Sequence, residues 1–254
     1  MLGRTAVAVF AVVVYLVFLG SFLAFVIFSS GLLPSFTVDA EARGSPLAAV
    51  ALDLCLVFLF GATHSVMARP RWKRLWTRGL GAGLERSVYV LVASIQLLLL
   101  CALWWPVAAP DLWRSSGALA IALQALAAVG WATALGSSYL IDHLALFGLR
   151  QGLGLAPVPD ALRTPFLYRI VRHPMYLGMV IGLWAAPRMT FSHALFAGLF
   201  TLYVLIGIRY EERALIRSFG KPYCDYQARV PMLLPLPRRT PAVTDAVAAR
   251  HARD

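Results

Sequence analysis

Apolar runs long enough to cross a bilayer alternate with short polar segments along the chain. A membrane-spanning helix needs about 20 predominantly apolar residues. Four such runs lie at about 5–28, 47–68, 87–108 and 117–141. A fifth apolar region covers about 174–208 and is interrupted by Pro187-Arg188. The pattern predicts an all-α integral membrane protein with five hydrophobic regions.

The fifth region differs from the others because its first half is short. His173 to Ala186 would form about 21 Å of helix at about 1.5 Å per residue, whereas the hydrocarbon core is about 30 Å thick. The region therefore predicts either a helical hairpin or a span that begins earlier, near Leu167.

Basic residues gather between the apolar runs. Segment 69–86 holds six Lys or Arg residues against a single acidic one, Glu85. Cytoplasmic loops of membrane proteins carry this excess of positive charge, so we expect this side to face the cytoplasm. Basic residues also lie on both sides of 174–208, which favours six crossings with both termini in the cytoplasm. The net charge of +11 fits this topology, and no nucleic-acid partner is expected.

The chain beyond the last apolar run predicts a surface helix and then a tail. Residues 209–229 have the mixed charge of an amphipathic helix at the membrane surface. From Pro231 onward the chain is rich in Pro, Arg and Ala, which is typical of disorder. We therefore expect one transmembrane domain over 1–230, ending in a cytoplasmic C-terminal amphipathic helix, and a disordered cytoplasmic tail over 231–254.

Composition supports a membrane protein and limits its chemistry. Mean hydropathy is +0.73 and only 14% of residues are charged, against about a quarter in an ordinary globular chain. The cysteines Cys55, Cys101 and Cys224 are scattered without CxxC spacing, so neither a zinc site nor a disulfide framework is predicted. No metal ion is expected.

Ionisable residues in or beside the apolar runs are the first candidates for chemistry, because burying them in lipid is costly. Asp53 and His64 are almost three helical turns apart, so we expect them on one face of the second span. Asp142-His143 closes the fourth span, where a histidine with an ordinary pKa of about 6.5 can act as a base or a hydrogen-bond donor. The alternatives are that Asp53 pairs helices and that Asp142-His143 only marks the membrane interface.

Two further segments predict a polar ligand site. Pro174 suits the first turn of a helix, and a helix N-terminus behind Arg169 and Arg172 predicts an anion site. Gly178 allows a ligand or a neighbouring helix to approach closely. Glu211-Glu212 lies where the last span meets water, and it can either bind hydroxyls or an amine of a ligand or form charge pairs on a solvated helix.

Together these segments resemble a known signature. Its residues here are Arg172–Gly178, Glu211–Leu215 and Phe219–Tyr226. This set resembles the C-terminal signature of the isoprenylcysteine carboxyl methyltransferase and phospholipid methyltransferase superfamily. A closer resemblance, to the bacterial methanethiol S-methyltransferases, is carried by Gly61–Pro70, Glu85–Leu91 and Ile141–Gln151. One departure from that family's pattern is Asp142, where we expect Asn.

The resemblance implies methylation of methanethiol to dimethyl sulfide with S-adenosyl-L-methionine, in the inner membrane of a bacterial cell. It implies a small-molecule thiol and membrane lipid as partners. The cofactor-binding residues it implies are Arg150, Gln151, Arg172, His173, Pro174, Tyr176, Leu177, Gly178, Glu211 and Glu212. Because the thiolate is the reactive form of a thiol, His64 and His143 are the candidates for the base or for thiol orientation. Asp142 or Glu85 would then fix a histidine tautomer, and Arg86 would stabilise a thiolate.

Three alternative functions stay open at this point. A methyltransferase acting on a prenylcysteine carboxylate or a phospholipid amine would need a long lipid-facing groove, whereas methanethiol needs only a small closed pocket. A sterol-reductase-like NADPH oxidoreductase ends in a similar HP-x-Y-x-G segment, but such enzymes are usually longer and have more spans. A non-catalytic membrane protein of similar topology would not bind the cofactor.

Overall fold

The computed structural model describes residues 3–42, 44–157 and 161–235, and it is helical almost throughout. In this described part of the chain, five helices are long and apolar enough to cross a membrane. They are α1 (Arg4–Ser30), α2 (Pro46–Met67), α4 (Ala82–Leu103), α5 (Gly117–Ile141) and α9 (Phe191–Phe219). Each of them overlaps one of the predicted apolar regions, so the helical class and its five regions are confirmed.

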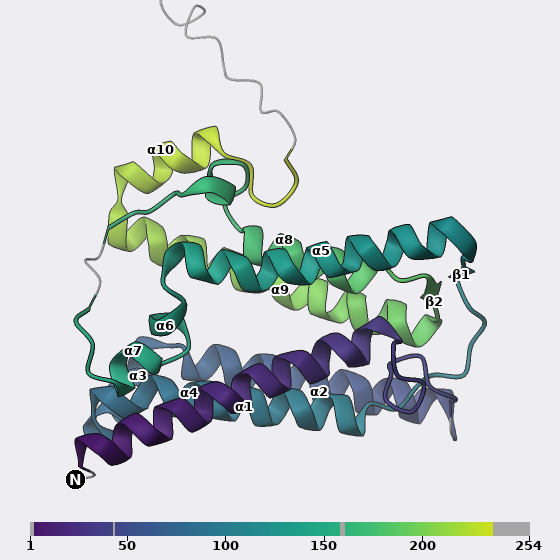
Figure 1. Ribbon diagram of the computed structural model, residues 1–254, viewed down its shortest axis with the longest axis horizontal. Coiled ribbons are helices and arrows are strands. Elements are labelled where there is room, and N and C mark those ends of the chain that lie inside the picture. Colours follow the sequence, from purple (N-terminus) through teal and green to yellow (C-terminus); the bar gives the residue numbers. More distant parts are fainter. Residues whose placement is uncertain (1–2, 43, 158–160, 236–254) are drawn as a thin grey trace, which may run out of the picture.

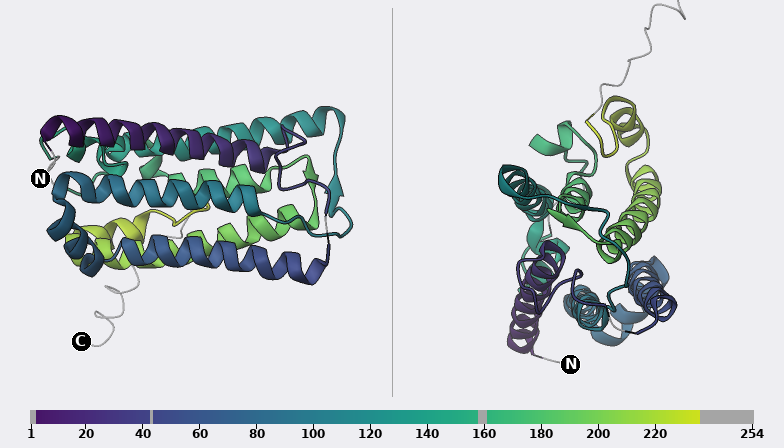
Figure 2. Two further views of the ribbon diagram at one scale, coloured as in Figure 1. Left: turned by 90° about the horizontal axis from the view of Figure 1, so that it is seen from below. Right: turned by 90° about the vertical axis from the view of Figure 1, so that its right-hand side faces the viewer.

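The long helices run side by side between the two ends of an elongated bundle (Figure 1). α1, α2 and α4 form one group, and α5, α8 (Pro174–Trp184) and α9 form the other, as the end-on view shows (Figure 2). α1 contacts α5 and α8, and α2 contacts α9. Interlocking apolar side chains join the groups, which is how helices associate in lipid. They include Phe25 of α1, Phe60 of α2, Leu100 of α4, Trp131 of α5 and Phe200 of α9.

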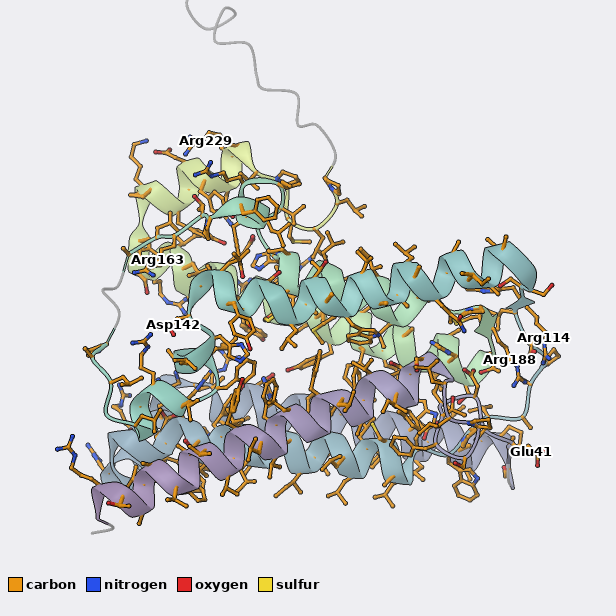
Figure 3. The ribbon with its side chains drawn as sticks, in the orientation of Figure 1. Glu41, Arg114, Asp142, Arg163, Arg188 and Arg229 are labelled. Atoms are coloured by element: carbon orange, nitrogen blue, oxygen red, sulfur yellow. The ribbon has the colours of Figure 1, made fainter. Side chains whose placement is uncertain are left out.

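The two ends of the bundle differ in charge. One end carries the N-terminus and the short helices α3 (Pro70–Leu80), α6 (His143–Leu146), α7 (Leu149–Gly152) and α10 (Lys221–Arg229) (Figure 1). Arg163 and Arg229 lie at this end, which we name the basic end (Figure 3). The opposite end carries β1 (Trp113–Arg114) and β2 (Arg188–Met189).

An extended segment divides the fifth hydrophobic region. α8 has 11 residues, which is about 16 Å of helix at 1.5 Å per residue, and α9 begins at Phe191. Between them β2 pairs antiparallel with β1, with Trp113 opposite Met189 and Arg114 opposite Arg188. The expected break at Pro187-Arg188 is therefore present, and the short ladder is a departure from an all-α fold.

A buried polar network fastens the end opposite the basic end. Fully buried His193 has its Nδ1 3.0 Å from Asp39 Oδ2 and its Nε2 2.9 Å from the carbonyl oxygen of Leu183. The Thr190 hydroxyl donates to the other Asp39 oxygen at 2.6 Å. These bonds tie the loop after α1 to the start of α9, and they satisfy polar groups that would be costly to bury alone.

The expected amphipathic helix over 209–229 is not continuous, so that prediction was wrong. α9 extends to Phe219, and α10 begins at Lys221. Gly220 between them has φ +59° and ψ −133°, a conformation that glycine adopts readily. Pro222 lies in the first turn of α10, where its missing N–H is not needed. Residues 236–254 of the expected tail lie outside the described residues.

Candidate functional site

Arg172, His173 and Glu212 form a buried ion-pair cluster at the N-terminus of α8. The Glu212 carboxylate accepts a hydrogen bond from Arg172 Nε at 2.7 Å and forms an ion pair with Arg172 Nη2 at 2.6 Å, and its Oε1 lies 3.1 Å from His173 Nε2. Gln227 of α10 donates to the other Glu212 oxygen at 3.0 Å. Buried charges are stable only when they are paired and hydrogen-bonded, so this cluster fixes how α8, α9 and α10 meet.

Protein atoms engage every nitrogen of the Arg172 guanidinium. Its Nε and Nη2 bind Glu212, and its Nη1 donates to the carbonyl oxygens of Gln227 and Val230 at 3.2 and 2.5 Å. The backbone N–H of Arg172 donates to the Pro231 carbonyl at 2.9 Å. Arg172 therefore clamps the chain that follows α10 against the start of α8.

Glu211 lies beside this cluster and is more accessible. Its side chain is 43% exposed, against 16% for Glu212, and it lies 4.0 Å from His173 Nδ1 and beside the Tyr176 side chain. Buried Tyr223 of α10 interacts with both carboxylates, yet its hydroxyl has no hydrogen-bond partner among the described residues. Burial raises the pKa of the Tyr223 phenol, so the group stays a neutral donor at physiological pH.

His64, near the end of α2, is surrounded by aromatic rings that we call the His64 box: Phe60, Tyr89 and Tyr203. Phe60 stacks on the imidazole with ring centroids 5.5 Å apart, and Tyr89 and Tyr203 flank it at 4.8 and 6.2 Å. Gly61 leaves room for Tyr203, since a Cβ there would lie 3.1 Å from that ring. His64 Nε2 lies 2.5 Å from the Tyr89 hydroxyl. Its Nδ1 is buried without a partner in the described chain, so one nitrogen is available to a ligand.

Three tyrosines connect the His64 box to the carboxylates. Tyr176 of α8, Tyr203 of α9 and Tyr89 of α4 interact electrostatically with one another. Tyr176 also lies beside Glu211, and Tyr89 is bonded to His64. The fold therefore brings the predicted cofactor segment and His64 together at the basic end.

His143, at the start of α6, has both ring nitrogens occupied. Nε2 lies 2.8 Å from the Tyr15 hydroxyl and Nδ1 2.6 Å from the Ser138 hydroxyl. Tyr139 stacks on the ring with centroids 3.8 Å apart. Burial lowers the pKa of His143, and the nearby Asp142 carboxylate opposes that shift. The ring joins α6 to α1 and α5, whereas His64 keeps one nitrogen without a partner among the residues described.

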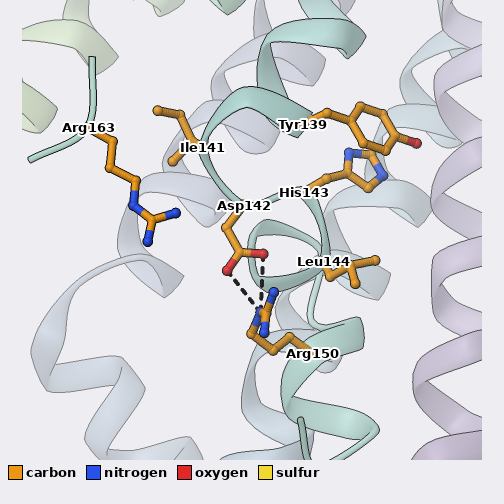
Figure 4. Close-up of a pocket in the computed structure, with 7 residues that line it drawn as sticks. All are labelled: Tyr139, Ile141, Asp142, His143, Leu144, Arg150 and Arg163. Atoms are coloured by element: carbon orange, nitrogen blue, oxygen red, sulfur yellow. Dashed lines mark hydrogen bonds and ion pairs between the residues drawn. The ribbon is translucent and has the colours of Figure 1, made fainter. Parts of the chain in front are cut away.

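A pocket of about 230 Å³ lies beside His143 (Figure 4). Its lining residues are Tyr139, Ile141, Asp142, His143, Leu144, Arg150 and Arg163. Asp142 pairs with Arg150 at 2.9 Å and accepts the Ala145 N–H at 3.0 Å, which caps α6. Arg163 extends toward this pair from the other side of the pocket (Figure 4). Two guanidinium groups near one opening suit an anionic group.

Arg86 and Glu85 lie next to the His64 box. Arg86 donates to the Leu146 carbonyl at 2.7 Å, and its guanidinium is 4.8 Å from the centroid of the Tyr89 ring. Glu85 interacts electrostatically with both Arg86 and Tyr89. The structure therefore places these two residues beside Tyr89, the partner of His64.

The remaining candidates make contacts within the protein. Gln151 donates to the Ala145 carbonyl at 3.2 Å. In α8, Pro174 and Gly178 are buried and Leu177 is half-buried. Asp53 is also buried and accepts the backbone N–H of Trp105 at 3.0 Å, which supports the alternative that it pairs helices. Asp53 and His64 both bond to partners on α4 or just after it, as expected for residues on one face.

Several residues of the site were not singled out from the sequence. Tyr89 and Tyr223 stand inside the motifs that carry the resemblance, and that position is a usable signal. Tyr203 and Tyr15 are single tyrosines in apolar runs, and Gln227 follows the last motif. Nothing in their spacing distinguishes these three from ordinary span or surface residues.

Comparison with known proteins shows which proteins the chain is similar to over most of its length. The phospholipid methyltransferase family profile matches residues 113–222. Methanethiol S-methyltransferase 2 of Bradyrhizobium diazoefficiens is 42% identical over 239 residues, which is 92% of each chain. Methanethiol S-methyltransferase of Mycobacterium tuberculosis is 43% identical over 232 residues, 89% of this chain and 94% of its own. Nurim of Rattus norvegicus is 31% identical over 189 residues, 68% of this chain and 71% of its own. No solved structure matches.

The family profile covers the ion-pair cluster of α8 and α9 but, of the His64 box, only Tyr203; His64, Phe60 and Tyr89 lie outside it. The alignments with the two methanethiol S-methyltransferases extend over about nine-tenths of the chain, more than the profile covers. At this identity and coverage the relationship suggested by the motifs is confirmed. The chain therefore belongs to the methanethiol S-methyltransferase family of phospholipid-methyltransferase-like membrane enzymes.

Proposed function

We propose that this protein methylates methanethiol to dimethyl sulfide, with S-adenosyl-L-methionine as the methyl donor. The reaction is supported by the relatives named methanethiol S-methyltransferase, which align with about nine-tenths of the chain. One structural observation carries the choice of site. The Nδ1 of His64 has no partner among the described residues and lies inside an aromatic box, and the box adjoins Tyr176 of the signature segment.

The groups around the start of α8 suit the donor. S-adenosyl-L-methionine, when bound, supplies an electrophilic methyl group on a positively charged sulfur. Glu211 and the neutral Tyr223 hydroxyl suit its amino and ribose hydroxyl groups, and the first turn of α8 suits its carboxylate. The buried hydroxyl of Tyr223, which has no partner in the described part of the chain, favours a ligand here, because buried polar groups are normally hydrogen-bonded.

The predicted cofactor residues, together with Tyr223, then divide into two roles. Arg172 and Glu212 are engaged with each other and hold α8, α9 and α10 in position. Glu211, Tyr176 and Tyr223 contact the donor, supported by His173, Pro174, Leu177 and Gly178 in the turn behind them. Arg150, with Gln151 beside it, remains the second candidate for the methionyl carboxylate from the neighbouring pocket.

His64 is the proposed base. Its Nδ1 takes the thiol proton, the sulfur keeps the electron pair, and the resulting thiolate is the form that attacks a methyl group. For Nδ1 to accept a proton, Nε2 must carry one and donate it to the Tyr89 oxygen, 2.5 Å away. Arg86 beside Tyr89 adds positive charge that favours the thiolate. His143 is less suited to this role because both its nitrogens are already bonded.

We also propose that the bundle crosses a bacterial inner membrane six times, with the basic end in the cytoplasm. α9 runs between the two ends, and the shorter α8 runs in the opposite direction beside it and is joined to it by β2. Arg69, Arg71, Lys73, Arg74 and Arg78 lie at the basic end, whereas Arg114 and Arg188 lie at the other. This asymmetry follows the positive-inside rule. It lets the charged donor enter from the cytosol and the apolar thiol from the bilayer.

The reaction is tested by incubating detergent-purified protein with S-adenosyl-L-methionine and methanethiol and measuring headspace dimethyl sulfide by gas chromatography. His64→Gln keeps a partner for Tyr89 but removes Nδ1, so kcat should fall about 100-fold or more while donor affinity is unchanged. The matched control His143→Gln should keep most of its kcat. Glu212→Ala should lose donor binding, measured by calorimetry.

Two results would change the proposal. Full activity of His64→Gln would remove His64 as the base. Measurable donor binding by the wild-type protein without dimethyl sulfide would keep a methyltransferase and exclude this acceptor. Prenylcysteine or phospholipid acceptors, supplied in the same assay, would then be the next to test.

A further inference from the structure

α3 has two chemically distinct faces. Its apolar residues Trp72, Leu75 and Trp76 follow the i, i+3, i+4 spacing of one helical stripe. Its basic residues occupy the other side of the helix. They are Arg71, Lys73, Arg74 and Arg78. A short helix with Trp on one side and Lys and Arg on the other is typical of helices that lie in a membrane interface.

The position of α3 in the fold places it at that level. The helix follows α2 directly and precedes α4, and both neighbours are long and apolar enough to cross the membrane. In Figure 1 α3 lies at the basic end, where these two helices stop. Trp72 is 41% exposed and Leu75 is 58% exposed. Their exposure to water is unfavourable, and the region between headgroups and acyl chains would cover them.

The positive charge of α3 and its flanking residues is not balanced by acidic residues within the same segment. Residues 69–84 contain five Lys or Arg residues and no Asp or Glu. Arg69 lies over the ring of Tyr210, 4.3 Å from its centroid. Arg71, Lys73, Arg74 and Arg78 are exposed, and none forms an ion pair with the residues that the structure describes. Four exposed cations without acidic partners are complementary to an anionic surface.

We propose that α3 binds the phosphate-bearing headgroups of anionic phospholipids in the leaflet around the basic end. Trp72 and Leu75 enter the boundary between headgroups and acyl chains, and the four cations contact the phosphates. An acidic protein would satisfy the charges but offers no reason for an exposed Trp and Leu beside two membrane spans. The lipid accounts for both faces of the helix.

The site is coupled to the His64 box by packing. Trp76 of α3 packs against a cluster that contains Met67 and Tyr89. Met67 lies one turn beyond His64, and Tyr89 is hydrogen-bonded to it. A lipid that holds α3 in place therefore also helps to hold Tyr89, the hydrogen-bond partner of His64, in position. This consequence rests on the proposed function, whereas the lipid site itself does not.

The test is a titration of short-chain phosphatidylglycerol into the detergent-solubilised protein, with binding followed by the rise in melting temperature. Replacing Arg71, Lys73, Arg74 and Arg78 by Gln should weaken the apparent affinity by about tenfold or more. A matched control replaces Arg213, Arg217, Lys221 and Arg229 by Gln and removes the same charge from the same end. The control should stay within about twofold of wild type.

A second variant tests the apolar face. Trp72→Ser with Leu75→Ser keeps every cation and should also weaken phosphatidylglycerol binding. Phosphatidylcholine of equal chain length and inorganic phosphate should raise the melting temperature far less in the wild-type protein. Equal weakening in the α3 and control variants would assign the effect to overall charge and overturn the proposal. So would a full stabilisation by inorganic phosphate, which would indicate a site for the free anion.

Discussion

Gly178 of α8 lies directly against the backbone of Ala134 of α5. A Cβ atom on Gly178 would fall 2.5 Å from the Ala134 nitrogen, closer than real contacts allow. Gly130 and Gly182 continue this contact one turn away on each helix, since a Cβ on Gly130 would lie 2.6 Å from the Gly182 nitrogen. α5 therefore sets the position of α8, and with it the position of His173 at the start of that helix.

Gly178→Ala should push α8 away from α5. We expect a loss of about 1–3 kcal/mol in stability, as for other overpacked cores, and weaker binding of S-adenosyl-L-methionine, because α8 carries Tyr176. Melting temperature and calorimetric donor titration measure the two effects. Gly136→Ala on α5 is the control, since a Cβ there meets nothing within 4 Å. Equal behaviour of the two variants would show that the close contact does not position α8.

Tyr89→Phe should impair the chemical step without weakening donor binding. The change leaves the ring in the His64 box but removes the hydroxyl bonded to Nε2, so the imidazole loses the partner that sets its tautomer. An unsatisfied buried group costs about 1–3 kcal/mol, which predicts a fall of about 5- to 150-fold in kcat at unchanged KM for the donor.

Tyr203→Phe is the matched comparison for this prediction. The Tyr203 ring also flanks His64, but the hydroxyl hydrogen-bonded to the imidazole is that of Tyr89. We expect Tyr203→Phe to keep most of its kcat and its pH profile, measured by dimethyl sulfide release. A similar loss in both variants would point to general disturbance of the box.

The sequence predicted the main parts of the candidate site but not how they meet. Arg172 and Glu212 stand out because charged residues border apolar runs, and the motifs carry both of them. Their pairing with Gln227 depends on the turn at Gly220, which redirects α10 toward α8. Tyr203 gives no signal, because one tyrosine in a long apolar run is compatible with any face of that helix.

The same limits apply to the fold. Apolar run length predicted the five long helices well, because the thickness of a bilayer sets that length. The 69–86 segment was interpreted only as a basic connection, yet the spacing of Trp72, Leu75 and Trp76 already has the period of a helix. The ladder of β1 and β2 could not be predicted, since it pairs two residues with two others far along the chain.

Asp111 forms ion pairs with Arg114 and Arg188 at the end opposite the basic end. These pairs should stabilise the protein at neutral pH and lose that effect in acid. Hydrogen bonds from Arg188 and Arg114 lower the pKa of Asp111 from 3.8 to about 2. A carboxyl group whose pKa is lower in the folded protein than in the unfolded one stabilises the fold at pH values above its unfolded-state pKa. This contribution is lost as pH falls toward 2. The melting-temperature difference between wild type and Asp111→Asn should be constant above about pH 5 and shrink toward pH 2. A difference independent of pH would exclude the charge as its cause.

Asp142 has two roles, a helix cap and an ion pair, and replacing it by Asn removes only the second. Its carboxylate caps α6 through the Ala145 N–H and pairs with Arg150 at 2.9 Å. Asp142→Asn keeps an acceptor for the cap but removes the charge that competes for Arg150. If Arg150 holds the donor's carboxylate, calorimetry should show tighter binding of S-adenosyl-L-methionine by Asp142→Asn. Asp142→Ala also loses the cap and should lose about 1 kcal/mol of stability. Weaker donor binding by Asp142→Asn would instead place the charged pair itself in the donor site, since the fold and the cap are preserved.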